Sequence, residues 1–110
     1  MFVPKYINQI TETMDEVQLK VNDRGRGEFY IGSDYDEIAE MEIQINKDNI
    51  TVYHTEVAKE QEGKGLAKKL LDHMVDYART HKLKVIPLCP YVYAQFKKHR
   101  QEYADLWDGK

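Results

Sequence analysis

Apolar and polar residues alternate through much of the first half of the chain, in the pattern of half-buried strands. Residues 17–21 carry valine or leucine at every second position, and residues 39–45 place apolar side chains at odd positions and glutamate or glutamine at even ones. A short aromatic and β-branched run at 28–31 lies between them, and turn-forming residues separate the three segments. We therefore expect three antiparallel strands, each with one face on a core and one toward water.

Residues 50–57, ITVYHTEV, are rich in β-forming residues but alternate less cleanly. Such a pattern is typical of an inner strand that touches structure on both faces. We expect this strand to lie at the centre of the sheet.

The second half of the chain changes to a helical period. After two glycines, apolar residues recur every three or four positions from 66 to 78, which predicts a helix of about four to five turns with one apolar face. Residues 84–88 then form a short apolar strand, which Pro87 and the Cys89-Pro90 step bring to an end. Residues 91–103 suggest a second, shorter helix, and Leu106 and Trp107 a last anchor to the core.

The order of these elements defines the fold class. An antiparallel meander followed by a strand, a helix and a strand predicts an α/β (α+β) fold, with a mixed, mostly antiparallel sheet and one right-handed βαβ unit. The sequence contains no internal repeat, low-complexity tract or linker, so we expect a single domain over residues 1–110. Residues 1–16 fit neither a helix nor a strand clearly and stay unassigned.

Composition narrows the setting in which the protein works. The chain carries 19 acidic and 16 basic residues, a net charge of −3, which argues against a general electrostatic grip on nucleic acid or on an anionic membrane. Its single cysteine, Cys89, excludes an internal disulfide framework, and no apolar run approaches the roughly 20 residues that span a bilayer. We expect a cytoplasmic monomer with neither nucleic acid nor a membrane as its partner.

The glycines at 63 and 65 stand where the fourth strand gives way to the helix. A Gly-x-Gly turn lets a backbone approach a ligand closely, and the first turn of a helix offers N–H donors that favour an anion. Spacing excludes three common phosphate sites: the P-loop needs four residues between its glycines, the dinucleotide fingerprint needs a glycine where Lys68 stands, and the KH loop needs Gly-x-x-Gly.

The segment Glu60-Gln61-Glu62-Gly63-Lys64-Gly65 resembles the pyrophosphate turn of the GNAT acetyltransferases, whose pattern is Gln/Arg-x-x-Gly-x-Gly/Ala. Glu60 departs from the usual Gln or Arg at the first position. Together with His54-Thr55 upstream and Pro87-Leu88-Cys89-Pro90-Tyr91 downstream, the turn is similar to that of the short YjdJ-type branch of this superfamily. The resemblance covers roughly residues 17 to 105.

The resemblance implies a minimal GNAT-like (acyl-CoA N-acyltransferase) fold, in which two parallel strands splay apart and acetyl-coenzyme A lies in the gap. The diphosphate then rests on the glycine turn, and a backbone amide near Val57 holds the thioester carbonyl. The implied cofactor-binding residues are Thr55, Val57, Glu62, Gly63, Lys64, Gly65, Leu66, Ala67, Cys89 and Tyr91.

Three residues are candidates for catalysis. Cys89 is either a covalent acetyl carrier or a bystander that shapes the pocket or protonates the departing thiolate, and a lone cysteine is also often a plain buried side chain. His54 and Glu56 are expected on one face of their strand, where either can take a proton from an incoming ammonium group. A packed histidine and a solvated carboxylate are the structural alternatives. Tyr91 and Tyr93 are candidate proton donors to the leaving thiolate.

The sequence therefore predicts a small acetyl-coenzyme A-dependent N-acetyltransferase that acts on an amine of a small molecule or of a protein. The alternative is a coenzyme A-binding or protein-interaction module with little or no transfer. A nucleic-acid-binding domain is a third option, against which the net acidity argues. We expect no metal site, since His73, His81 and His99 lack metal-ligand spacing.

Overall fold

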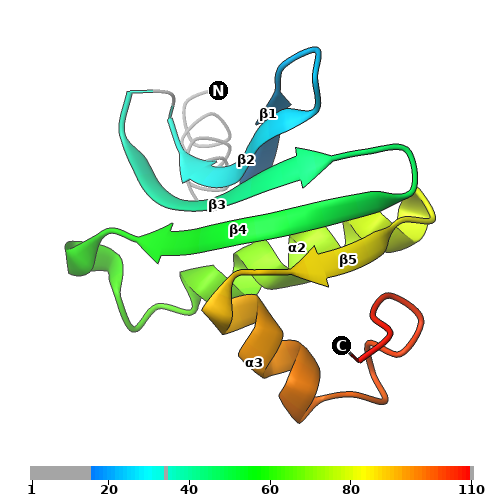
Figure 1. The fold of residues 1–110 in the computed structure, drawn as a ribbon. Coiled ribbons are helices and arrows are strands. Elements are labelled where there is room, and N and C mark those ends of the chain that lie inside the picture. The colour runs from blue at the N-terminus through cyan, green and yellow to red at the C-terminus, as the bar shows by residue number, and fades with distance from the viewer. Residues whose placement is uncertain (1–15, 34, 110) are drawn as a thin grey trace, which may run out of the picture.

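The computed structural model describes residues 16–33 and 35–109, which form a mixed sheet with two α-helices (Figure 1). The strands are β1 (Val17–Val21), β2 (Arg26–Gly32), β3 (Glu37–Ile45), β4 (Asn49–Val57) and β5 (Lys84–Pro87). A 3₁₀ turn, η1 (Lys59–Gln61), precedes helix α2 (Leu66–Thr80), and helix α3 (Pro90–Lys98) follows β5. Residues 1–15, which include nearly all of the unassigned N-terminal segment, lie outside the described residues.

The strands lie in sequence order across the sheet. β1 to β4 pair antiparallel, and β4 and β5 pair parallel across the α2 crossover. This is the expected meander followed by a βαβ unit, so the fold class is confirmed. The prediction that β4 lies at the centre of the sheet was wrong. β3 is the central strand, and β4 lies between β3 and the edge strand β5.

The irregular alternation of β4 has two causes. Ile50, Thr51 and Val52 are all buried, as expected of an inner strand that touches structure on both faces, and a bulge follows them. In its register with β3, Glu42 pairs with His54 but Ile43 pairs with Val52, so Tyr53 is an extra, bulged residue. A bulge of this kind shifts the side-chain period by one position. Even-numbered residues therefore face the core before Tyr53 and odd-numbered residues face it afterwards.

Helix α2 packs along one face of the sheet (Figure 1). Its buried residues join the inward side chains of β2, β3 and β4 in one hydrophobic core. At about 25 cal/mol per Å² of apolar surface removed from water, this burial is what holds α2 on the sheet. None of the helices in the described part of the chain is both long and apolar enough to cross a membrane.

The second predicted helix is shorter than expected. α3 ends at Lys98, and the chain continues in turns through residues 99–106 instead of reaching Tyr103 as a helix. Tyr103 still lies in the core, stacked on Phe96 with ring centroids 4.5 Å apart. The turns bring Leu106 and Trp107 back to the core, which confirms the predicted anchor.

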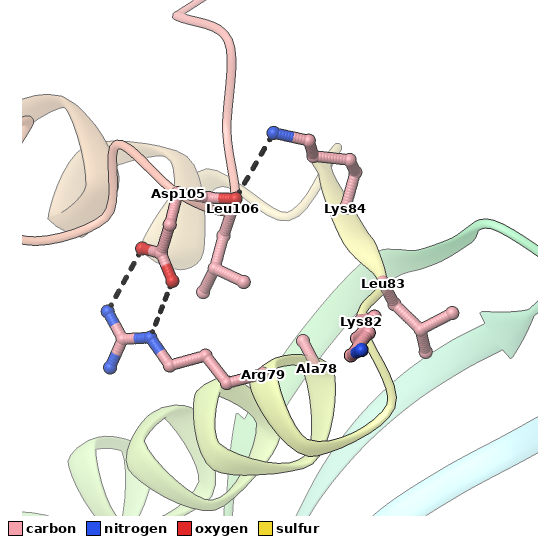
Figure 2. Close-up of a pocket in the computed structure, with 7 residues that line it drawn as sticks. All are labelled: Ala78, Arg79, Lys82, Leu83, Lys84, Asp105 and Leu106. Carbon is pink, nitrogen blue, oxygen red and sulfur yellow. Dashed lines mark hydrogen bonds and ion pairs between the residues drawn. The ribbon is translucent and has the colours of Figure 1, made fainter.

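The C-terminal segment closes the outer edge of β5. The backbone N–H of Val85 donates to the carbonyl of Leu106 at 2.8 Å, and the Arg79 guanidinium donates to both carboxylate oxygens of Asp105. Figure 2 shows this ion pair and the hydrogen bond that the Lys84 ammonium donates to the Asp105 carbonyl. Arg79, Lys84 and Asp105 line a pocket of about 440 Å³. Because these groups bond one another, we interpret this pocket as part of the structure that holds the C-terminus in place.

Candidate functional site

The two parallel strands separate at one end of the sheet. Paired residues between β4 and β5 run from Asn49–Lys84 to Val52–Pro87, and the N–H of Cys89 then donates to the Val52 carbonyl at 2.8 Å. β4 continues for residues 53–57 beyond its last β5 partner, while the chain after β5 turns into α3 (Figure 1). β5 is paired with β4 over its whole length and then ends, so the structure shows an edge of β4 beyond Val52 without a β5 partner, at the place where the resemblance predicted splayed strands.

The glycine turn opens at the same end of the sheet. Gly63 and Gly65 have φ of 85° and 77°, the left-handed region that glycine adopts without strain. A Cβ at either position would meet no protein atom within 4 Å among the described residues, so the space above the turn is open. Gly65 is the N-cap of α2 without a side-chain cap, and the first turn of the helix holds no acidic residue. Its first N–H groups are available to an anion.

A pocket of about 370 Å³ joins the glycine turn to the end of β4. It is lined by Val57, Gln61, Glu62, Gly63, Gly65, Leu66, Ala67, Lys68 and Tyr91. Seven of these were expected from the sequence as cofactor-binding residues. Gln61 was not, although its position beside the glycine turn could have suggested it. Lys68, in the first turn of the helix, adds a cation to the pocket wall.

The other expected cofactor residues lie close to this pocket without lining it. The Lys64 ammonium donates to the Gln61 side-chain oxygen at 3.0 Å, along the turn. Thr55 lies two residues before Val57 on β4, and its Oγ1 is 3.3 Å from the Cys89 sulfur. The roles of these residues in cofactor binding stay predictions.

Cys89 is buried, with 1% of its surface exposed. It is the N-cap of α3, and Pro90 begins the helix. Its sulfur contacts Thr55 and belongs to the hydrophobic core. This environment suits a packed side chain beside the site better than an open nucleophile.

His54 and Glu56 lie on the outward face of β4, as the alternation predicted. His54 Nε2 is 3.7 Å from Glu56 Oε1, and both side chains are exposed. Of the two, Glu56 lines a second pocket, which shares Val57 and Glu62 with the first one. Glu56 therefore lies next to the residues that the two pockets share, Val57 and Glu62, whereas His54 lines neither pocket.

Tyr91 supplies a hydroxyl at the far side of the first pocket. Burial raises the pKa of this phenol above its ordinary value of 10.0. The side chain thus keeps its proton at neutral pH and can donate it. Tyr93, the other tyrosine considered, is more exposed and stands edge-to-face with Trp107, with ring centroids 5.6 Å apart.

Three carboxylates on β2 and β3 were missed as a group. Glu28, Glu37 and Glu40 each place an oxygen within 4.8 Å of the others, and Lys20 lies 2.8 Å from Glu37. In the sequence they appear only as water-facing positions of separate strands. Their proximity depends on the strand register, which the alternation does not give.

Comparison with known proteins places this geometry in a family. A family model described as GCN5-related N-acetyl-transferase matches residues 28–106. The solution structure of a GCN5-like protein from Staphylococcus aureus is 29% identical, with 82% of this chain and 86% of that chain covered and a TM-score of 0.61. No curated protein sequence matches the chain.

Two more distant structures share the fold. A ribosomal-protein-alanine N-acetyltransferase from Brucella melitensis is 22% identical, with 74% of this chain and 64% of that one covered and a TM-score of 0.54. The ribosomal-protein-S18-alanine N-acetyltransferase from Escherichia coli is 20% identical, with 59% and 42% covered and a TM-score of 0.51. The family model spans most of the chain, and the end of β4 without a β5 partner and the glycine turn lie within it. The chain belongs to the GCN5-related N-acetyltransferase family.

Proposed function

We propose that this protein binds acetyl-coenzyme A in the pocket at the glycine turn and transfers the acetyl group to an amine. The observation that carries the proposal is the continuity of that pocket, from the uncapped start of α2 to Val57 at the end of β4. A pocket with an anion site at one end and an unpaired strand edge at the other fits a long ligand with a diphosphate and two amides.

The residues present fit such a ligand. The first N–H groups of α2 would hold the diphosphate, and the open space at Gly63 and Gly65 leaves room for it. The β4 backbone past Val52 would pair with the amides of the pantetheine arm in the manner of an added strand. When bound, acetyl-coenzyme A supplies the acetyl group as an activated thioester.

Two side chains of the site can move protons. Glu56 lies next to Val57 and can take a proton from the acceptor nitrogen, with His54 close to its carboxylate. Tyr91 holds its proton at neutral pH, because burial raises its pKa, and can donate it to the departing sulfur. We assign Cys89 to packing against Thr55 next to the pocket, on the basis of its burial.

We also infer that the chain falls in the short YjdJ-type branch. His54-Thr55 and Pro87 to Tyr91 support this, since both lie at the opening between β4 and β5.

A second candidate function is binding of coenzyme A without transfer. The lining of the pocket at the glycine turn favours it, because neither Glu56 nor His54 lies in that lining and cofactor binding alone therefore brings neither candidate base to the thioester. An assay of thiol release separates the two candidates: the parent is incubated with acetyl-coenzyme A and a panel of primary amines, and the acetylated product is identified by mass. Transfer predicts thiol release that depends on the amine. Tight cofactor binding without release from any amine would leave only the binding function.

A further inference from the structure

The second pocket lies where β3 begins and β4 ends. It has a volume of about 380 Å³ and shares Val57 and Glu62 with the pocket at the glycine turn. The remaining residues of its wall are Glu37, Ile38, Ala39, Glu40, Glu56, Ala58 and Lys59. Because the two pockets meet at Val57, a molecule in the second one lies next to the end of the cofactor pocket.

Four of these wall residues are glutamates and one is a lysine. Glu40 and Glu56 are directly opposite each other on β3 and β4, an arrangement of like charges that destabilises a sheet. A hydrogen bond to Glu37 raises the pKa of Glu40, as expected where carboxylates crowd together. An incoming cation would relieve this repulsion.

Among the described residues, lysine and arginine side chains form ion pairs with the neighbouring carboxylates but not with Glu40 or Glu56. Lys20 lies 2.8 Å from Glu37, and Arg26 lies 2.6 Å from Glu42. Within residues 16–33 and 35–109, neither lysine nor arginine comes within salt-bridge distance of Glu40 or Glu56. The uncompensated charges of Glu40 and Glu56 therefore lie in the second pocket, with Glu56 next in sequence to Val57 of the shared wall.

We propose that this second pocket is the acceptor site and that the acceptor is a small amine with a second positive charge, as in aliphatic diamines and polyamines. The proposal rests on the proposed acetyltransferase function. Glu56 receives the reacting ammonium next to Val57, and Glu40 with Glu37 holds the second charge one strand away. The pocket volume is near the low end of the roughly 300–1,000 Å³ typical of small-molecule sites, which favours a small amine over a polypeptide.

The transfer balances with the groups present. The ammonium loses one proton to the Glu56 carboxylate, the nitrogen forms its bond to the acetyl carbon as the carbon–sulfur bond breaks, and the sulfur takes one proton from Tyr91. The nitrogen then gives its second proton to the Tyr91 phenolate, which leaves a neutral amide, a free thiol and one proton on Glu56 to be released to water. The second ammonium group stays charged and unmodified.

The test compares putrescine with butylamine, which has the same four-carbon chain but one charge. Thiol release gives kcat/KM for each amine with the parent, with Glu40→Gln and with Glu42→Gln as the matched control. Glu42 lies on the same strand and face but pairs with Arg26 outside the pocket. We expect the parent to prefer putrescine by about tenfold or more, the value of one good charge-assisted contact.

Glu40→Gln should abolish most of this preference by raising KM for putrescine, and Glu42→Gln should keep it. Equal kcat/KM for the two amines, or equal effects of the two variants, would overturn the acceptor assignment and leave the acetyltransferase function standing. Acetyl-coenzyme A binding without any turnover of putrescine would overturn it as well. Absence of acetyl-coenzyme A binding would instead remove the proposed function itself. Thermal unfolding checks that Glu40→Gln is folded, and removal of one of two opposed charges predicts no loss of stability.

Discussion

At the scale of single residues, the buried thiol of Cys89 gives a direct prediction. A covalent relay needs a sulfur that the thioester can reach, whereas Cys89 is 1% exposed and contacts Thr55. We expect the parent to gain no acetyl group on Cys89 when incubated with acetyl-coenzyme A, as measured by intact mass. Cys89→Ala should keep most of the turnover and lose about 1 kcal/mol of stability through the small cavity it leaves.

Cys89→Ser serves as the control for packing, because it keeps the size of the side chain and a hydroxyl for Thr55. An acetyl adduct mapped to Cys89, together with loss of turnover in both variants, would show that the relay operates.

The sequence was most informative at residues whose chemistry depends on local spacing. Gly63 and Gly65 could be assigned to a turn before a helix because two glycines and an apolar period lie within a few positions of each other. Glu40 could not be assigned to a pocket, since Glu56 lies opposite it through the pairing of β3 with β4, and Glu37 lies at the irregular end of the β2–β3 register. Alternation indicates that a residue faces outward, but not which residues of other strands lie beside it.

At the scale of elements, the outward face of the β2–β3 pair should make folding sensitive to pH. Partial burial and the neighbouring carboxylates Glu37 and Glu40 raise the pKa of Glu28 from 4.5 to about 7, although Lys20 opposes the shift. The folded state therefore holds a proton that the unfolded state has already lost. Between these two pKa values the free energy of unfolding should fall as the pH rises.

Ionisation of Glu37 changes the stability with pH in the opposite direction. Its pKa is lowered, first through a hydrogen bond with Glu28, so its contribution is lost only as the pH falls below its ordinary value of 4.5. Urea unfolding of the parent and of Glu28→Gln at a series of pH values separates the two effects. In Glu28→Gln, the free energy of unfolding should fall less steeply between pH 4.5 and about 7 than in the parent. An equally steep fall in both proteins would show that other groups cause it.

The bulge in β4 shows where reading of an element from its sequence failed. Its residues were correctly predicted as a strand, and the expected burial on two faces is found at residues 50–52, but the change of core-facing positions after them was not predicted. The physical cause is the extra residue Tyr53, which moves the core-facing positions from even to odd numbers. Bulges depend on the partner strand, so one strand taken alone does not reveal them.

At the scale of the whole molecule, the C-terminal segment should stabilise the fold by closing the edge of β5. Arg79 holds this segment through Asp105 and through the Glu102 carbonyl at 2.8 Å. Arg79→Gln should lower the free energy of unfolding by up to about 1 kcal/mol, the range of a well-formed surface ion pair. Lys82→Gln is the control, since Lys82 lines the same pocket and its side chain makes neither a hydrogen bond nor an ion pair in the described part of the chain.

The effect of Arg79→Gln should also depend on pH. Arg79 lowers the pKa of Asp105 below its ordinary value of 3.8, so the stability that the pair contributes is present above that value and lost as the pH falls further. Denaturant unfolding near neutral pH and in acid measures this. A difference between parent and variant that persists unchanged in acid would contradict the assignment to this ion pair.

The order of elements across the molecule was predictable, whereas the end of the chain was not. Strand and helix periods gave the meander, the crossover and the mixed sheet. Residues 99–103 were expected to extend α3, since they carry a helix-like mixture of charged and apolar residues. Residues 99–106 instead form turns, because these bring Tyr103, Leu106 and Trp107 to the core, a tertiary gain that local propensity does not contain.

The central claim is that the glycine turn and the end of β4 together bind acetyl-coenzyme A. Isothermal titration calorimetry of the parent, Gly63→Ala and Gly63→Glu tests it most directly. Both variants share the strain of a side chain at φ 85°, about 1–2 kcal/mol, but only glutamate places a negative charge in the open space above the turn. We expect the parent to bind with a dissociation constant in the micromolar range, Gly63→Ala to bind more weakly and folded Gly63→Glu not to bind. No heat of binding from the parent, or equal affinity of the parent and Gly63→Glu, would contradict this claim.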